Sequence, residues 1–206
     1  MDKEVKLVKK VKGLVRKAGL PRWLHRFGPK RYEFWHHALA LLVREYCKLS
    51  FRRVKQFFDL LGLVCPSKSA LQYTLKRVPF ALWQRLLQAT VSPVACVVAV
   101  DATTFPTSNP SFHYLRRIDD KKTRKTVKVS IAVNTKTKKV LAARLPSKHV
   151  GDAKEVRYLL ANCKPKNLVA DKGYDAEHVH KFAYEHSIQA HIPLRKNAKH
   201  GHYRMK

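Results

Sequence analysis

The sequence contains few acidic residues. Of its 206 residues, 14 are Asp or Glu and 43 are Lys or Arg, which gives a formal net charge of +29 at pH 7. A chain with this excess repels itself unless a polyanion is near, and nucleic acid is the usual polyanion because each neutralised phosphate releases counterions. Binding to ribosomes or to membrane surfaces would produce the same excess. The shortage of acids therefore indicates a class of partner and nothing finer.

The sequence also lacks closely spaced cysteines and long apolar runs. Its cysteines, Cys47, Cys65, Cys96 and Cys163, form no C-x-x-C pair, so a zinc knuckle is not expected. We expect buried, reduced thiols, which fits a reducing cytoplasm. No apolar run is long enough for a signal peptide or a membrane span. A globular protein with no membrane partner is predicted, in the cytoplasm and associated with the nucleoid.

The first 30 residues are basic and then broken. They carry ten Lys or Arg, and Pro21, Gly28 and Pro29 interrupt the segment. This pattern predicts a short basic helix followed by a linker. The segment either contacts DNA phosphates or forms a solvated arm, and the pattern leaves both open.

From Tyr32 to about Thr90, apolar residues recur at helical spacing. Ser50 and Ser67 are predicted N-caps of two successive helices, with Gly62 in the turn between them. A further helix is predicted at about 81–89, after Pro79. The positions expected to face inward on the two capped helices are Phe51, Val54, Phe57, Phe58, Leu61, Leu71, Thr74, Leu75 and Val78.

Residues 50–78 therefore have the order of a helix-turn-helix, in which a short turn containing Gly joins two helices. Exposed positions of the second helix, Lys68, Gln72, Lys76 and Arg77, carry side chains that can contact phosphates or base edges. The alternative is a plain helical bundle with a lysine-rich solvent face. The charge of the chain favours DNA contact.

After Pro93 the apolar pattern changes. Residues 94–100 form a nearly unbroken apolar run, which is typical of a strand buried on both faces. The later pattern alternates between strands and helices, which indicates a mixed α/β domain over residues 93–206, after a basic arm at 1–30 and a helical DNA-binding region at 31–92. The further elements predicted are strands at about 112–118, 126–134, 139–145, 167–170 and 188–193, and helices at about 152–161 and 175–186.

Two apolar strands end in an aspartate, at Asp101 and at Asp171. In open α/β sheets, ligands collect at the carboxyl ends of the strands, and a carboxylate there is costly to bury unless it binds a cation or a donor. We expect the two strands to be adjacent and parallel, so that both carboxylates can coordinate Mg²⁺ or Mn²⁺. The alternative is that each Asp caps the turn that follows it.

Three motifs resemble those of DDE transposases of bacterial and archaeal insertion sequences. They are Val-Asp-Ala-Thr at 100–103, Ala-Asp-Lys-Gly-Tyr-Asp at 170–175, and His-Ile-Pro-Leu-Arg-Lys-Asn at 191–197. The resemblance covers about residues 94–197. It implies an α/β fold with a ribonuclease-H-like mixed sheet and flanking helices, preceded here by the all-α, helix-turn-helix-like region.

The same resemblance implies an activity and a site. The activity is metal-dependent strand cleavage and strand transfer on double-stranded DNA at terminal inverted repeats, by a homodimer or larger assembly on the DNA. Asp101 and Asp171 would be the catalytic residues and the ligands of Mg²⁺ or Mn²⁺. Lys172 and Arg195, with His149, flank this site and are predicted to contact DNA phosphate or metal-bound water, with plain surface cations as the alternative. His178 and His180, two residues apart, are predicted to lie on a solvated helix.

One departure from the family pattern concerns a third acid. The resemblance implies a glutamate beyond residues 191–197, yet no Asp or Glu occurs from Ser187 to Lys206. Asp152 matches a polar position of the family but not the third catalytic position. We therefore expect the catalytic domain to be incomplete at its C-terminus.

Three functions remain open on the sequence. The first is an active transposase. The second is a non-catalytic DNA-binding remnant that occupies terminal repeats and represses transposition, and the third is a basic RNA-binding protein. Asp101 and Asp171 favour the first two functions over the third, and the missing glutamate favours the second over the first.

Overall fold

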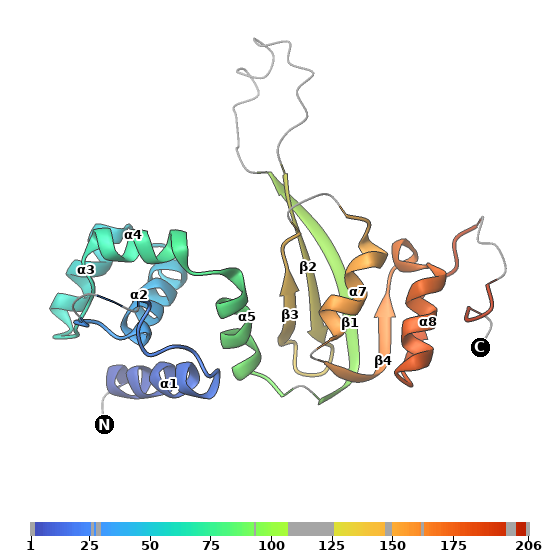
Figure 1. Ribbon diagram of the computed structural model, residues 1–206, viewed down its shortest axis with the longest axis horizontal. Coiled ribbons are helices and arrows are strands. Elements are labelled where there is room, and N and C mark those ends of the chain that lie inside the picture. Colours follow the sequence, from blue (N-terminus) through green and yellow to red (C-terminus); the bar gives the residue numbers. More distant parts are fainter. Residues whose placement is uncertain are drawn as a thin grey trace, which may run out of the picture. The chain divides into compact units, whose positions relative to one another are not determined.

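The computed structural model describes residues 3–25, 27, 30–92, 94–106, 126–146, 150–161, 163–196 and 201–204. The chain divides into two compact units, Met1–Thr90 and Val91–Lys206, and each has its own hydrophobic core. The first unit is helical and the second is α/β (Figure 1). The strand predicted at about 112–118 lies outside the described residues, as does His149.

The first unit is built from short amphipathic helices around one core. Phe34, Val54, Phe58 and Leu71 are almost completely buried there. The first helix takes part in this core, because Val11 and Val15 are buried in it. The helices are α1 (Lys3–Lys17), α2 (Phe34–Tyr46), α3 (Phe51–Leu60), α4 (Lys68–Arg77) and α5 (Phe80–Ala89).

Both predicted serine caps are present. The Ser50 hydroxyl accepts a hydrogen bond from the backbone N–H of Arg53 at 3.3 Å, and the Ser67 hydroxyl accepts one from Ala70 at 3.2 Å. Each bond satisfies a donor that the first turn of a helix leaves without a partner. Gly62 has a φ of +62°, a left-handed conformation that a residue with a Cβ seldom adopts. Local chain chemistry therefore sets where α3 ends and α4 begins.

Replacing Ser67 with Ala should lower the free energy of unfolding of the first unit by about 1 kcal/mol, because the N–H of Ala70 loses its acceptor. Urea unfolding followed by tryptophan fluorescence measures this change. Ser69→Ala is the matched control, since Ser69 is exposed in the first turn of the same helix. Equal stability of the two variants would show that the cap contributes nothing.

The predicted inward faces are wrong at Phe57, Leu61 and Leu75, which are exposed. In α3 the buried side chains are Val54 and Phe58, which are four residues apart and occupy a single narrow stripe. The described helices of this unit cover that stripe, and Phe57 and Leu61 beside it remain in contact with solvent.

The second unit contains a five-stranded sheet in the order β3-β2-β1-β4-β5. The pairs β1–β2 and β2–β3 are antiparallel, and the pairs β1–β4 and β4–β5 are parallel. This mixed sheet is the arrangement that the resemblance implied, and the predicted α/β fold class is confirmed. The strands are β1 (Val94–Pro106), β2 (Thr126–Asn134), β3 (Val140–Arg144), β4 (Lys164–Ala170) and β5 (Gln189–His191).

Two helices of the second unit, α7 (Asp152–Leu160) and α8 (Glu177–Glu185), contribute to the core of the sheet (Figure 1). Val98 and Val100 of β1 are buried, whereas Val97 and Ala99, which alternate with them, are half-buried. The expectation that residues 94–100 are buried on both faces is therefore wrong for the described part of the chain. A strand that is packed with helices on one face explains the alternation.

The expectations drawn from composition have mixed outcomes. All four cysteines are free; Cys65 and Cys163 are buried as expected, but Cys47 and Cys96 are exposed. Burial raises the pKa of both buried thiols to about 11, so they stay protonated at neutral pH. No helix in the described ranges has the length and apolar character that crossing a membrane requires.

Candidate active site

Asp101 and Asp171 start from neighbouring positions on adjacent strands. Val100 of β1 pairs with Ala170 of β4 in parallel register, and Asp101 and Asp171 are the residues that follow this pair. Asp171 directly follows the end of β4, as expected, but β1 continues beyond Asp101 to Pro106, so the expectation that this strand ends in its aspartate is wrong. Adjacent strands lie about 4.8 Å apart. Both aspartates are exposed, and they alternate with the buried Val100 and Ala170, so their side chains leave the sheet on the same side. The predicted adjacent and parallel arrangement of the two strands is therefore present.

Each of these carboxylates has one oxygen engaged by the backbone. Asp101 Oδ1 accepts the N–H of Ala102 at 2.8 Å, and Asp171 Oδ1 accepts the N–H of Gly173 at 2.9 Å. Asp171 is thus the N-cap of the 3-10 turn η1 (Lys172–Tyr174), which is the capping role considered as the alternative. Within the described residues, the second oxygen of each carboxylate has no hydrogen-bond partner. Capping and metal binding are therefore compatible at Asp171.

Gly173 makes room for the Asp171 carboxylate. A Cβ at position 173 would lie 2.9 Å from Asp171 Oδ1, which is closer than real Cβ contacts allow. Any side chain at this position would therefore push the carboxylate away and disturb the 2.9 Å bond to the Gly173 N–H. This close approach gives a physical reason for glycine in the Asp-Lys-Gly-Tyr motif.

Tyr174 lies close enough to several carboxylates for their negative charges to affect its hydroxyl. Its side chain is buried, and its hydroxyl has no hydrogen-bond partner among the residues that the structure describes. Burial raises the pKa of the Tyr174 hydroxyl, and the negative charges of Asp152, Asp101 and Asp171 raise it further. The phenol is therefore neutral at physiological pH and lies in the field of several carboxylates, an environment that a cation would stabilise.

Mg²⁺ and Mn²⁺ fit the donors that are present here. Both ions prefer carboxylate oxygens, and Asp101 and Asp171 each offer one that has no hydrogen-bond partner in the part of the chain that the structure describes. Asp152 is already engaged, because it forms an ion pair with the buried Lys128. Among the residues that the structure describes, no group of three or more His, Cys, Asp or Glu side chains is assembled for a metal. The two aspartates are thus the donor pair that these neighbouring positions of β1 and β4 provide.

The predicted DNA-contacting residues of the first unit are all exposed on α4. The guanidinium of Arg77 lies 4.5 Å from the centre of the Tyr73 ring, so its direction is partly set by this contact. The connection between α3 and α4, residues 61–67, is longer than the turn of about 3–4 residues in a helix-turn-helix. The two helices therefore keep the predicted order but differ from that motif in their connection. The exposed residues are Lys68, Gln72, Lys76 and Arg77.

The two residues of the second unit that are predicted to contact DNA, Lys172 and Arg195, differ in their surroundings. Lys172 is exposed beside Asp171. Arg195 donates hydrogen bonds from its guanidinium to the backbone carbonyls of Lys172, at 2.8 Å, and of Gly173. Arg195 is thus tied to the turn that follows Asp171 and is not a plain surface cation.

Sequence reasoning missed the carboxylate of Asp175, which is completely buried and joins three parts of the chain. Asp175 Oδ1 accepts Arg204 Nε at 2.7 Å and lies 3.1 Å from His180 Nε2, while Oδ2 accepts the backbone N–H of Arg195 at 2.9 Å. Burial alone would raise the pKa of Asp175, but these donors together hold it below its usual value. His180 is buried by this contact, so its predicted place on a solvated helix face is wrong.

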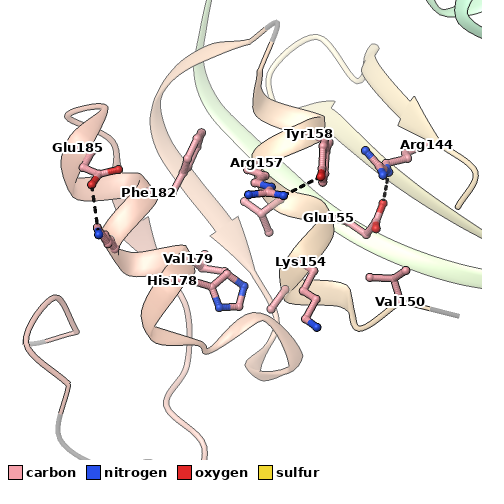
Figure 2. Close-up of a pocket in the computed structure, with 13 residues that line it drawn as sticks. Arg144, Val150, Lys154, Glu155, Arg157, Tyr158, His178, Val179, Phe182 and Glu185 are labelled. Carbon is pink, nitrogen blue, oxygen red and sulfur yellow. Dashed lines mark hydrogen bonds and ion pairs between the residues drawn. The ribbon is translucent and has the colours of Figure 1, made fainter. Parts of the chain in front are cut away.

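A pocket of about 540 Å³ lies between α7 and α8 (Figure 2). It is lined by both helices, with Arg144 and Val150 at one end. Arg144 forms an ion pair with the buried Glu155, and its guanidinium lies 3.6 Å from the centre of the Tyr158 ring. Arg144 is therefore already partnered, and neither Asp101 nor Asp171 lines the pocket. The pocket is therefore not the candidate catalytic site.

A family model described as the transposase DDE domain matches residues 92–205. Among solved structures, the cryo-EM structure of the piggyBac transposase synaptic complex with hairpin DNA is similar at 12% sequence identity, with a TM-score of 0.44. The alignment covers 94% of this chain and 49% of that one, so this chain spans about half of its length. No curated protein matches the sequence.

Proposed function

Because the chain belongs to the transposase DDE-domain family, we propose that it acts in metal-dependent cleavage and transfer of DNA strands at the terminal inverted repeats of an insertion sequence. The observation that carries this proposal is the parallel pairing of Val100 with Ala170, which sets Asp101 and Asp171 side by side. The exposure of both carboxylates leaves space for an ion and a phosphate.

In this proposal each residue of the site has a separate role. Asp101 and Asp171 would hold Mg²⁺ or Mn²⁺ through the second carboxylate oxygen of each, which no backbone N–H of the described ranges engages. The bound ion would supply activation of a water or a 3′-hydroxyl and stabilise the leaving oxygen. The Gly173 N–H would keep Asp171 oriented, and the exposed Lys172 would attract the phosphate backbone.

Double-stranded DNA is the proposed partner, and a homodimer or larger form the proposed assembly on it. The net charge of +29 and the exposed cations of α4 support contact with phosphates. Binding of this kind depends steeply on salt, because it releases condensed counterions.

Replacing Lys76 and Arg77 together with Ala should weaken binding to duplex DNA. If each residue contacts one phosphate, the slope of log affinity against log salt should fall by about 2 in magnitude. Titration of labelled duplex DNA with the full chain at several salt concentrations measures the slope. The charge-matched control is the pair Lys136→Ala and Lys139→Ala, at exposed positions near the turn between β2 and β3. An unchanged slope in the α4 variant, or an equal loss in the control, would place the DNA contact elsewhere.

A second candidate function is a non-catalytic DNA-binding protein that occupies terminal repeats and represses transposition. The two-carboxylate donor set favours it, since the described residues assemble no third ligand. Incubation of the full chain with duplex DNA and Mn²⁺ separates the two candidates. Nicking that requires Mn²⁺ supports the transposase, and salt-dependent binding without nicking supports the repressor. Preference for RNA over DNA in competition would favour the basic RNA-binding protein.

A further inference from the structure

Arg195 makes three hydrogen bonds to one short segment of the chain. Its Nε donates to the carbonyl of Lys172 at 2.8 Å, its Nη2 donates to the carbonyl of Gly173, and its backbone N–H donates to Asp175 Oδ2 at 2.9 Å. All three acceptors belong to the four residues that follow Asp171. Arg195 is therefore hydrogen-bonded to the turn that begins at Asp171, the proposed metal ligand.

One of these bonds acts on the peptide group that holds the Asp171 carboxylate. The carbonyl of Lys172 and the N–H of Gly173 belong to the same planar peptide unit and point in opposite directions. Arg195 donates to the carbonyl side of this unit, and Asp171 Oδ1 accepts from its N–H side at 2.9 Å. Fixing the peptide plane thus fixes the direction of the N–H, and the charged donor strengthens the bond on the far side.

We propose that Arg195 is a positioning residue, whose guanidinium holds the peptide between Lys172 and Gly173 so that Asp171 presents its second carboxylate oxygen to the metal. This inference rests on the proposed function, in which Asp171 is a ligand. Arginine suits the task because its planar fork reaches two carbonyls at once, which the single ammonium group of lysine cannot do in the same geometry.

The direction in which Arg195→Ala changes the affinity for Mn²⁺ distinguishes a positioning role from a simple effect of charge. A guanidinium near a cation site repels the cation, so loss of its charge alone would make Mn²⁺ bind more tightly. Loss of orientation at Asp171 would make Mn²⁺ bind more weakly. The Arg195→Ala substitution also keeps the backbone N–H that contacts Asp175, so the anchoring of the segment is retained.

The test measures Mn²⁺ binding to the full chain by calorimetry. We expect Arg195→Ala to weaken Mn²⁺ binding by about 10–100-fold, the range typical of groups that orient a metal ligand. Added guanidinium chloride at millimolar concentration should restore part of the loss, and Arg195→Lys should restore little. The control, Lys196→Ala, removes one positive charge at the exposed neighbouring position and should leave Mn²⁺ affinity unchanged or slightly higher. Unchanged or tighter binding in Arg195→Ala, or an equal loss in Lys196→Ala, overturns the positioning role.

Hydrogen exchange of the Gly173 amide tests the same role without metal. This N–H should be protected in the parent chain and exchange faster in Arg195→Ala, while Lys196→Ala stays like the parent. Equal protection in all three chains overturns the positioning role, whatever the metal result. A different result would overturn the proposed metal site: the parent chain does not bind Mn²⁺, or it still binds Mn²⁺ after both Asp101→Asn and Asp171→Asn. In that case the hydrogen-exchange result alone decides whether Arg195 holds the peptide.

Discussion

Two single substitutions, Asp101→Asn and Asp171→Asn, should each lower the affinity of the chain for Mn²⁺ by about tenfold or more. This corresponds to a loss of at least about 1.4 kcal/mol of binding free energy in each variant. Each substitution keeps the shape of the side chain but removes one of the two anionic donors that adjacent strands place together. Calorimetric titration of the full chain with Mn²⁺ measures the loss, and nicking of duplex DNA should fall with it.

A control is needed because any lost negative charge weakens cation binding to some degree. Glu185→Gln removes one such charge from an exposed position on α8, where Glu185 lies 3.8 Å from Lys181. Its Mn²⁺ affinity should match that of the parent chain. If both aspartate variants bind Mn²⁺ as the parent does, the metal ligands lie elsewhere and the proposed site is wrong.

Asp175→Asn should lower the free energy of unfolding of the second unit by about 3–5 kcal/mol. The substitution removes the charge that balances Arg204, and a buried ion pair that loses one partner leaves an uncompensated charge. Urea unfolding followed by far-ultraviolet circular dichroism reports this change. Tryptophan fluorescence reports the first unit, because Trp23, Trp35 and Trp83 all lie there, so its transition should not move.

The contribution of Asp175 should also depend on pH with a defined sign. The pKa of Asp175 is lower in the folded chain than in the unfolded chain, where an aspartate has a pKa of about 3.9. Stability from this group is therefore fully present above about pH 4 and is lost as the pH falls through the folded pKa. The difference between the parent and Asp175→Asn should shrink in that acid range. A difference that is constant from pH 6 to pH 2 would contradict the ionised state of Asp175.

Exposed ion pairs of the same unit provide the comparison for this prediction. Glu185→Gln breaks an exposed pair with Lys181, and such pairs contribute about 0.3–0.5 kcal/mol. The variant should thus unfold almost as the parent does. A loss as large as that of Asp175→Asn would mean that net charge, and not the buried contact, controls stability.

Short-range patterns were sufficient to predict most elements of the second unit. The apolar runs before Asp101 and Asp171 predicted β1 and β4, because a strand repeats every two residues and needs only local sequence to be recognised. The caps at Ser50 and Ser67 were predicted for the same reason, since a cap bonds an N–H three residues ahead. The parallel pairing of β1 with β4 followed from general rules of α/β sheets rather than from a contact visible in the chain.

Burial and long-range contacts could not be predicted from short-range sequence patterns. Asp175 meets Arg204, 29 residues later, and Arg195 meets Lys172, 23 residues earlier. No periodic pattern links residues so far apart, and the sequence therefore suggested a phosphate contact for Arg195 and no role for Asp175. Phe57 and Leu75 have the apolar character of core residues, yet they are exposed because no described element of the first unit covers their side of the helix. Local sequence specifies which conformation a segment prefers, whereas partner and burial depend on which other segments pack against it, and packing is a property of the folded chain.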